Sequence, residues 1–286
     1  MKFHRIYIEV TNECGLACSF CPSSVSVPQK LSLEFFESII LQAQKYTKEI
    51  ACHVMGDPLR VANLSDYLDI LQKYKMKALL TTSGYYFKKH SLQTLFHPAI
   101  KQINVSLNSY NKNDTSLTLE QYLTPIMTLC KAKADANLFI NLRLWNLDEQ
   151  SSEKNFNKKV FDFIGEYFLV DINIKKLYQN PPKTIRLASK VLLHFDTYFE
   201  WPSLDNPLYG HGTCQGLSSH IAILVDGSVV PCCLDSKGII ALGNLKEESL
   251  QNILQKSHTQ TIIEGFKDGI ATEELCQHCS YKNRFN

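Results

Sequence analysis

Between residue 5 and about residue 174, short apolar runs alternate with longer segments in which apolar residues recur at helical spacing. The short runs predict strands at Arg5–Val10, Ile50–Met55, Lys77–Thr81, Ile103–Leu107, Phe139–Leu144 and Val170–Ile174. The longer segments predict helices at Leu33–Tyr46, Leu64–Tyr74, Leu119–Ala134 and Asn155–Tyr167, and Ser32 is suited to cap the first of them. Strands that alternate with helices form right-handed βαβ units around a parallel sheet. The pattern therefore predicts an α/β fold, a partial (β/α)6 TIM-like barrel.

Unusual polar and glycine residues follow these predicted strands. A loop with three cysteines follows the first strand, and Met55-Gly56-Asp57-Pro58 and Thr81-Thr82-Ser83-Gly84 follow the second and third. The fourth strand ends in Val105-Ser106-Leu107-Asn108, and the fifth contains Arg143. In parallel barrels the reactive site lies at the carboxyl ends of the strands. The strand order alone thus predicts that these residues belong to one site.

The three cysteines of the first loop are Cys14, Cys18 and Cys21, spaced C-x3-C-x2-C. Thiolates are the usual ligands of iron–sulfur clusters. Three of them hold three irons of a cubane and leave the fourth iron open to a small molecule, as in other catalytic metal sites. A zinc site with its fourth ligand elsewhere is the alternative, although zinc sites usually pair their ligands as C-x2-C.

A second cysteine group lies in the last quarter of the chain. Cys214 precedes a strand-like run at 218–225, and the turn Asp226-Gly227 predicts a hairpin that returns to Cys232 and Cys233. A helix-like stretch at 249–256 follows, and Cys276 and Cys279 form a C-x2-C pair. Four thiols complete a closed site, which suits a second cluster or a structural zinc ion. Whether Cys232 or Cys233 is the ligand is left open by the pattern.

The C-x3-C-x2-C loop, with Phe20 before its last cysteine, resembles the signature of the radical S-adenosylmethionine (radical SAM) superfamily. The resemblance implies a [4Fe-4S] cluster held by Cys14, Cys18 and Cys21, with S-adenosylmethionine chelated to the open iron. One electron then cleaves it to a 5′-deoxyadenosyl radical, which abstracts a hydrogen from the substrate.

The same resemblance implies cofactor-binding roles for residues at the ends of the strands. The sequence around Gly56 and Asp57 is similar to the family's GGEP motif, although Met55 replaces a glycine and Asp57 replaces a glutamate. Thr82 lies in a turn similar to the family's T-N-G turn. The residues implied to contact S-adenosylmethionine are Phe20, Gly56, Asp57, Thr82, Ser106, Asn108 and Arg143. Turn geometry is the alternative explanation of Gly56 and Asp57.

The C-terminal cysteine pattern resembles the SPASM/twitch extension of radical SAM enzymes. Gly227 precedes Cys232, Gly243-Asn244-Leu245 follows the hairpin, and the sequence ends seven residues after Cys279, as expected for the form with a single auxiliary cluster. The resemblance implies an auxiliary [4Fe-4S] cluster on Cys214, Cys232, Cys276 and Cys279, which accepts the second electron of an oxidation. The predicted division is a barrel at 1–178, a bridge at 179–213 and a small α+β SPASM/twitch domain at 214–286.

The composition agrees with a soluble globular protein. Of the 286 residues 44% are hydrophobic and 20% are charged, and the net charge of +2 gives no signal for nucleic acid. No apolar run has the length of a membrane span, and the N-terminus lacks a signal-peptide core. Ten cysteines without an export signal favour cluster or metal binding in a reducing compartment, so we expect a cytoplasmic protein. Cys52 and Cys130, which are isolated, are expected in the core.

Three functions are consistent with these features. The favoured one is oxidation of a small alcohol or sugar, and the first alternative is modification of a ribosomal peptide or protein by a maturase. The second alternative is a zinc-binding interaction or regulatory protein on a degenerate barrel. Both enzyme hypotheses require an electron donor such as flavodoxin or ferredoxin. No motif identifies the general base, for which His53, Tyr110 and Asp205 are candidates, and the substrate and oligomeric state cannot be read from the sequence.

Overall fold

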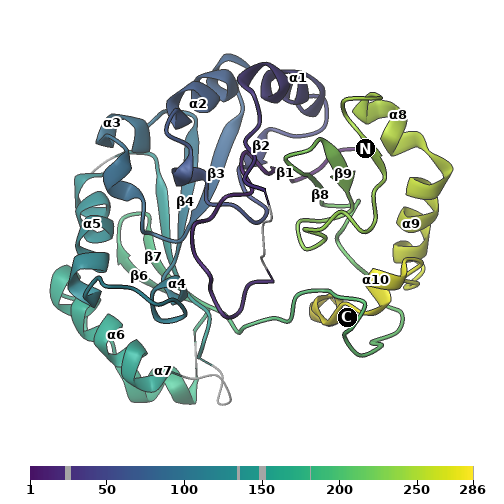
Figure 1. Cartoon of the computed structure of the whole chain (residues 1–286). Helices are drawn as coiled ribbons and strands as arrows, with labels where there is room; N and C mark the ends of the chain where they lie inside the picture. The colour runs from purple at the N-terminus through teal and green to yellow at the C-terminus, as the bar shows by residue number, and fades with distance from the viewer. Residues whose placement is uncertain (23–26, 134–135, 148–152, 181, 286) are drawn as a thin grey trace. The chain divides into compact units, whose positions relative to one another are not determined.

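The computed structural model describes residues 1–286 except 23–26, 134–135, 148–152, 181 and 286. Its residues form two compact units. Figure 1 labels the helices and strands of both. The first unit comprises Met1–Gly15, Pro22–Leu79 and Phe199–Asn286, and the second comprises Leu16–Cys21 and Leu80–Tyr198. Among the described residues, no helix has the length and apolar character needed to cross a membrane.

The first unit contains strands of a sheet in the order β10-β9-β8-β1-β2-β3. The strands are β1 (Arg5–Ile8), β2 (Glu49–Ala51), β3 (Lys77–Thr82, which continues into the second unit), β8 (His220–Ile223), β9 (Ser228–Val230) and β10 (Gly243–Asn244). The helices are α1 (Leu33–Ala43), α2 (Leu64–Lys73), α8 (Leu250–Gln255), α9 (Ser257–Lys267) and α10 (Glu274–Gln277), with 3-10 turns at Pro58–Arg60 and Ser280–Arg284. Strand β1 pairs in parallel with both β2 and β8, whereas β8, β9 and β10 are antiparallel neighbours.

The second unit contains strands in the order β4-β5-β7-β6. Its elements are the 3-10 turn Phe87–Lys89, α3 (Leu92–Leu95), β4 (Ile100–Ser106), α4 (Asn108–Asn111), α5 (Leu119–Ala132), β5 (Phe139–Leu144), α6 (Lys154–Phe168), α7 (Ile174–Gln179), β6 (Thr184–Ala188) and β7 (Val191–Phe195). Strands β4, β5 and β7 are parallel, and β6 returns antiparallel to β7.

Local sequence explains where the helices begin. The Ser32 hydroxyl accepts a hydrogen bond from the Phe35 N–H at the start of α1, as predicted. Thr118 and Gln121 form a capping box at the start of α5, whose predicted last residue, Ala134, lies outside the described residues. Strand side chains such as Ile6 and Ile8 are completely buried. The predicted α/β fold with a mainly parallel sheet is confirmed.

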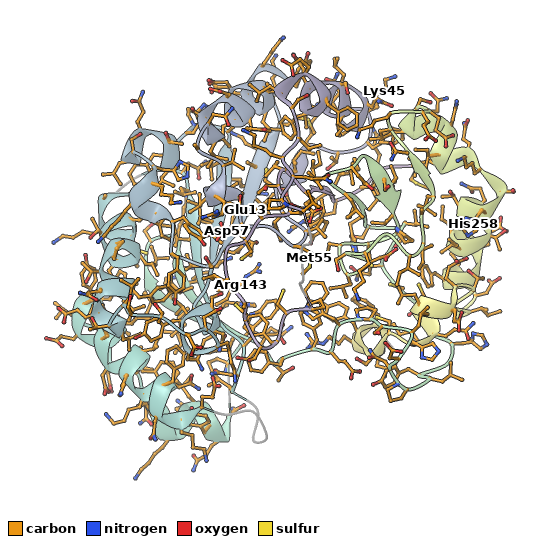
Figure 2. All side chains as sticks on the ribbon, viewed as in Figure 1. Glu13, Lys45, Met55, Asp57, Arg143 and His258 are labelled. Carbon is orange, nitrogen blue, oxygen red and sulfur yellow. The ribbon has the colours of Figure 1, made fainter. Side chains whose placement is uncertain are left out.

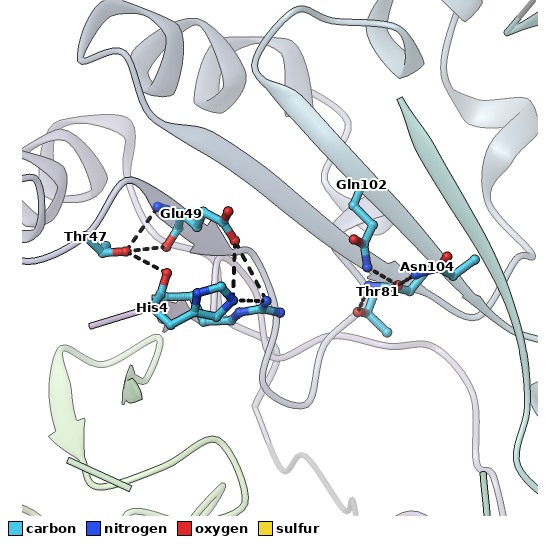
Figure 3. Close-up of polar contacts among 8 residues, drawn as sticks. His4, Thr47, Glu49, Thr81, Gln102 and Asn104 are labelled. Atoms are coloured by element: carbon cyan, nitrogen blue, oxygen red, sulfur yellow. Dashed lines mark hydrogen bonds and ion pairs between the residues drawn. The ribbon is translucent and has the colours of Figure 1, made fainter. Parts of the chain in front are cut away.

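Polar contacts fix the starts of β1 and β2. The Thr47 hydroxyl donates to the carbonyls of His4 and Glu49, at 3.1 Å and 3.3 Å, and accepts from the Glu49 N–H (Figure 3). Arg5 lies 3.8 Å from the Glu49 carboxylate. These bonds replace the water that the backbone groups at the strand ends would otherwise need.

The sixth predicted strand, at Val170–Ile174, is wrong. Leu169 is left-handed, with φ of 54°, and the Val170 N–H donates to the Gly165 carbonyl, so these residues end α6. The Asn173 side chain then caps α7 by accepting from the Lys176 N–H. The strand parallel to β5 is instead β7, which lies in the segment predicted to be a bridge.

A buried carboxylate connects three segments of the first unit. Glu9, at the end of β1, is 3% exposed and accepts from the N–H groups of Met55, at 3.0 Å, and Val225, at 3.2 Å. Burial raises the pKa of Glu9 to about 7, although these two backbone bonds oppose the shift. Glu9 therefore joins the first strand to the loop after β2 and to the C-terminal hairpin.

The raised pKa of Glu9 predicts a pH-dependent stability. The folded chain binds a proton at Glu9 that the unfolded chain, with a pKa near 4.5, releases. This contribution to the free energy of unfolding is complete below pH 4.5. It declines as the pH rises, and on the order of 3 kcal/mol is lost by about pH 7. In Glu9→Gln this decline should be absent, as measured by urea unfolding at pH 5 and pH 8. The exposed Glu34→Gln is the control, and an unchanged pH slope in Glu9→Gln would contradict the prediction.

Candidate functional site

The second half of the cysteine loop is held by one asparagine of the second unit. The Asn113 side chain accepts from the Ala17 N–H at 2.7 Å and donates to the Cys18 sulfur at 2.8 Å. The Cys21 N–H donates to the Cys18 carbonyl, so that these two cysteines share one turn. Burial raises the pKa of the Cys18 thiol, while hydrogen bonds from Asn113 and Ser109 lower it. Such hydrogen bonds orient a sulfur ligand and stabilise its thiolate form.

The first half of the loop lies against the segment after β2 in the first unit. A Cβ atom on Gly56 would lie 1.9 Å from the Thr11 carbonyl oxygen, so only glycine permits this approach. The Asp57 N–H donates to the Glu13 carbonyl at 3.1 Å, and the Glu13 carboxylate forms an ion pair with Arg60. Figure 2 labels Glu13, Met55 and Asp57. Cys14 follows Glu13 directly and is partly exposed.

Three side chains occupy one row across the carboxyl ends of the parallel strands of the second unit. Ser106 on β4 is paired in register with Arg143 on β5, and Arg143 is paired with His194 on β7. Residues in register on neighbouring strands point to the same face of a sheet. The structure therefore brings the predicted residues Ser106 and Arg143 together, and adds His194, which the sequence prediction missed.

The missed histidine has a defined environment. The Arg143 guanidinium lies 5.2 Å from the Trp145 ring, and the Trp145 indole N–H lies 3.5 Å from His194 Nδ1. Burial lowers the pKa of His194, and the positive charge of Arg143 lowers it further. His194 is therefore a neutral imidazole at pH 7, able to accept a proton. Its only signal in the sequence was a histidine within the apolar run Val191–Phe195.

Amide side chains fill the next positions of the same face. Asn104 on β4 is paired in register with Asn141 on β5, which donates to its carbonyl oxygen at 3.1 Å. Gln102 also donates to Asn104, at 2.7 Å, and Asn104 in turn donates to the Thr81 hydroxyl, at 3.2 Å (Figure 3). This network fixes a polar floor below the row of Ser106, Arg143 and His194.

The other predicted contact residues make structural interactions. Asp57 caps the 3-10 turn at Pro58–Arg60, and the Thr82 hydroxyl accepts from the Gly84 N–H. Phe20 packs on the Tyr198 ring, with centroids 5.5 Å apart. Asn108, which is 4% exposed, accepts from the Trp145 N–H at 2.8 Å, but its buried amide nitrogen has no hydrogen-bond partner among the described residues. Cofactor roles for these residues remain predictions.

The four predicted C-terminal thiols form one group in the first unit. Burial raises the pKa of Cys232 well above its usual range, and the nearby Cys233, Cys214 and Cys276 raise it further. Burial also raises the pKa of Cys276, and the charges of Cys214 and Cys279 act in the same direction. The Gly216 N–H donates to the Cys214 sulfur at 3.4 Å. Thiols in such a group bind a positive metal centre as thiolates and release their protons.

The structure distinguishes Cys232 from its neighbour. Cys233 packs against the apolar cluster of Val54, Ala222, Leu224 and Val230, and its sulfur accepts a hydrogen bond from Tyr7. Burial raises the pKa of the Cys233 thiol to about 11. Of the other predicted ligands, Cys214 and Cys276 act electrostatically on Cys232, whereas only Cys214 is named for Cys233, so we expect Cys232 to be the ligand. Cys52 and Cys130 are buried at 2% and 5% exposure, which confirms their predicted place in the core.

In the part of the chain that the structure describes, no three His, Cys, Asp or Glu side chains are close enough together to hold a single metal ion. His278 uses its Nδ1 in a 2.5 Å contact with the Asn206 carbonyl, which anchors the loop between Cys276 and Cys279.

Comparison with known proteins identifies the C-terminal region and a relative of the whole chain. Residues 214–280 match the SPASM family, described as an iron–sulfur cluster-binding domain, which confirms the predicted character of the C-terminal region. The chain is 21% identical over 286 residues to the S-adenosyl-L-methionine-dependent 2-deoxy-scyllo-inosamine dehydrogenase of Niallia circulans. That alignment covers 97% of this chain and 93% of the dehydrogenase.

Two solved structures share the fold. The crystal structure of BtrN in complex with AdoMet and 2-DOIA gives a TM-score of 0.62 at 17% identity, covering 98% of this chain and 94% of BtrN. Streptococcus suis SuiB bound to the precursor peptide SuiA gives a TM-score of 0.61 at 16% identity, covering 99% of this chain and 73% of SuiB. These similarities agree with the predicted partial barrel.

The positions of Cys232 and Cys233 predict different effects of their removal. Cys232→Ala should lose most of the roughly four irons of the second cluster, since it removes one of the four ligands of a closed site, whereas Cys233→Ala should keep them. Iron and sulfide analysis after anaerobic reconstitution measures this, with Cys233→Ala as the matched neighbouring control. Equal iron content in the two variants, or selective loss in Cys233→Ala, would contradict the assignment.

Proposed function

We propose that this chain, a radical SAM enzyme with a C-terminal SPASM domain, oxidises a small alcohol or sugar to the corresponding carbonyl compound. The observation that carries the proposal is the pair of thiol groups: three cysteines in the loop after β1 and four in the C-terminal region. Three thiols suit a cluster that binds a small molecule at its open iron, and four suit a closed cluster that only exchanges electrons.

The residues of the first group fit a [4Fe-4S] cluster. Cys14, Cys18 and Cys21 are partly exposed thiols, and Asn113 holds Cys18 by its sulfur. S-adenosylmethionine bound to such a cluster supplies the 5′-deoxyadenosyl radical that takes a hydrogen atom from the substrate. The chain's own contribution is local: in the first unit Gly56 permits the close approach to Thr11, and in the second unit Asn113 holds Ala17 and Cys18.

In place of the S-adenosylmethionine contacts predicted for Ser106 and Arg143, we assign the row of Ser106, Arg143 and His194 to the substrate side of the site. A hydroxyl, a guanidinium and a neutral imidazole are hydrogen-bonding groups suited to a polyhydroxylated molecule. His194 accepts the hydroxyl proton as the carbon is oxidised, and the nearby Arg143 stabilises the negative charge that develops on the oxygen. Similarity to a dehydrogenase of 2-deoxy-scyllo-inosamine supports a substrate of this class.

The electron balance requires the second thiol group. Removing one hydrogen atom and one proton from an alcohol leaves one electron to be accepted. Cys214, Cys232, Cys276 and Cys279 would hold the auxiliary [4Fe-4S] cluster that takes it, and a donor such as flavodoxin or ferredoxin would supply the electron that starts the reaction. The fold shared with SuiB, which was solved with a precursor peptide, supports peptide modification as the second candidate function.

Removal of one cysteine from each group tests the proposal. The reconstituted chain should hold about eight irons, the content of two cubanes. Cys14→Ala should abolish reductive cleavage of S-adenosylmethionine. Cys276→Ala should retain this cleavage but form no oxidised product, because the last electron has no acceptor. The measurements are iron analysis, chromatography of 5′-deoxyadenosine and mass spectrometry of product, with 2-deoxy-scyllo-inosamine as the first substrate tried.

The alternatives give different results in the same experiment. Stoichiometric zinc without a brown chromophore would indicate the zinc-binding interaction protein. Cleavage that is coupled only to mass changes in an added peptide would indicate the maturase. Product formation by Cys276→Ala at the wild-type rate would overturn the proposed role of the auxiliary cluster.

The lowered pKa of His194 predicts a characteristic pH profile. A base loses its function when it is protonated, so product formation should persist as the pH falls to 6.5 and decline only below that value. His194→Gln should lower the rate of product formation by about 100-fold and remove this acidic limb, while iron content remains unchanged. The exposed His211→Gln is the control. A wild-type rate and pH profile in His194→Gln would exclude it as the base.

A further inference from the structure

A buried lysine lies beside the four-thiol group. Lys282, in the 3-10 turn Ser280–Arg284, is 2% exposed, and its ammonium group donates to the carbonyls of Cys279 at 2.9 Å and Gln277 at 3.4 Å. It also lies 5.7 Å from the centre of the Tyr209 ring. All these contacts are with electron-rich atoms, as a positive charge requires when it is removed from water.

The same turn surrounds Cys279. The sulfur of Cys279 receives backbone N–H groups of Tyr281 and Lys282, which oppose the effect of burial on the pKa of its thiol. The groups whose charges act on Lys282 are Cys279, Cys276 and Cys214. Burial lowers the pKa of Lys282 and these three cysteines raise it, so the lysine and the thiolates stabilise one another. The proposed mechanism leaves this lysine without a role.

A fixed positive charge changes the energy of an electron on a nearby cluster. The reduced cluster carries one more negative charge than the oxidised one, so a cation beside its thiolates stabilises the reduced form more. Because the site is partly buried, water screens this interaction weakly.

We propose that Lys282 is a positioning and tuning residue that raises the reduction potential of the auxiliary cluster, so that it accepts the substrate's electron. This inference rests on the proposed ligand set of Cys214, Cys232, Cys276 and Cys279. A purely structural alternative is that Lys282 only ties the last turn to the loop at Gln277–Cys279. The two roles are separable, because glutamine keeps hydrogen-bond donors without the charge and arginine keeps the charge.

The test measures the potential of the auxiliary cluster by itself. In the full chain with Cys14, Cys18 and Cys21 replaced by alanine, only the second cluster remains, and its midpoint potential is followed by electron paramagnetic resonance during a redox titration. Lys282→Gln should lower the potential by at least the equivalent of a tenfold change in the equilibrium constant, about 59 mV for one electron. Lys282→Arg should stay near the parent value. Arg284→Gln, which removes an exposed charge from the same turn, is the control and should change little.

The outcomes separate this inference from the proposed function. A parent chain without a second cluster would refute the proposed function itself. If the parent chain holds the cluster and Lys282→Gln and Arg284→Gln have the same midpoint potential, only the inference about Lys282 would be overturned. If Lys282→Gln fails to retain the cluster, retention by Lys282→Arg would support a role for the charge, and loss in both would show that only packing matters.

Discussion

The position of β1 between β2 and β8 is the constraint on which the first unit depends. Strand β1 pairs in parallel with both neighbours, so the strand that leads into the cysteine loop is also bonded to the hairpin of the C-terminal region. Glu9 reinforces this arrangement, since its two oxygens accept from backbone groups after β2 and after β8. The Glu9 side chain suits this position because its two oxygens can each accept a hydrogen bond. A buried backbone N–H that lacks an acceptor would destabilise the fold.

The proposed chemistry depends on groups held by strands and not by free loops. Three parallel strands in register place Ser106, Arg143 and His194 in one row. The Trp145 ring contacts Arg143 and His194. Side chains on packed strands lose little entropy when a substrate binds, so the geometry is already prepared. The cysteine loop receives comparable support from Asn113, whose side chain bonds a backbone N–H and a sulfur.

The C-terminal thiols illustrate how burial and charge are combined. Every thiol of the group has a raised pKa because it is removed from water. Binding of a metal centre to these thiols would therefore release protons. Lys282 supplies a positive charge at the same place, and the Cys279 sulfur receives two backbone N–H groups. A cluster of thiolates would satisfy all of these groups at once.

The sequence by itself determined the local features. Spacing identified the two cysteine groups, the apolar period identified the first five strands, and Asp226-Gly227 identified the β8–β9 hairpin, because each signal lies within a few neighbouring residues. Only the tertiary structure decided which strand completes the row beside Arg143. Residues 170–174 alternate like a strand but are captured by the end of α6 and the cap of α7, whereas Val191–Phe195 pairs with β5. The choice between Cys232 and Cys233, and the place of Lys282 beside the thiols, likewise depend on long-range packing: adjacent residues point in different directions, and the partners of each lie far away in the chain.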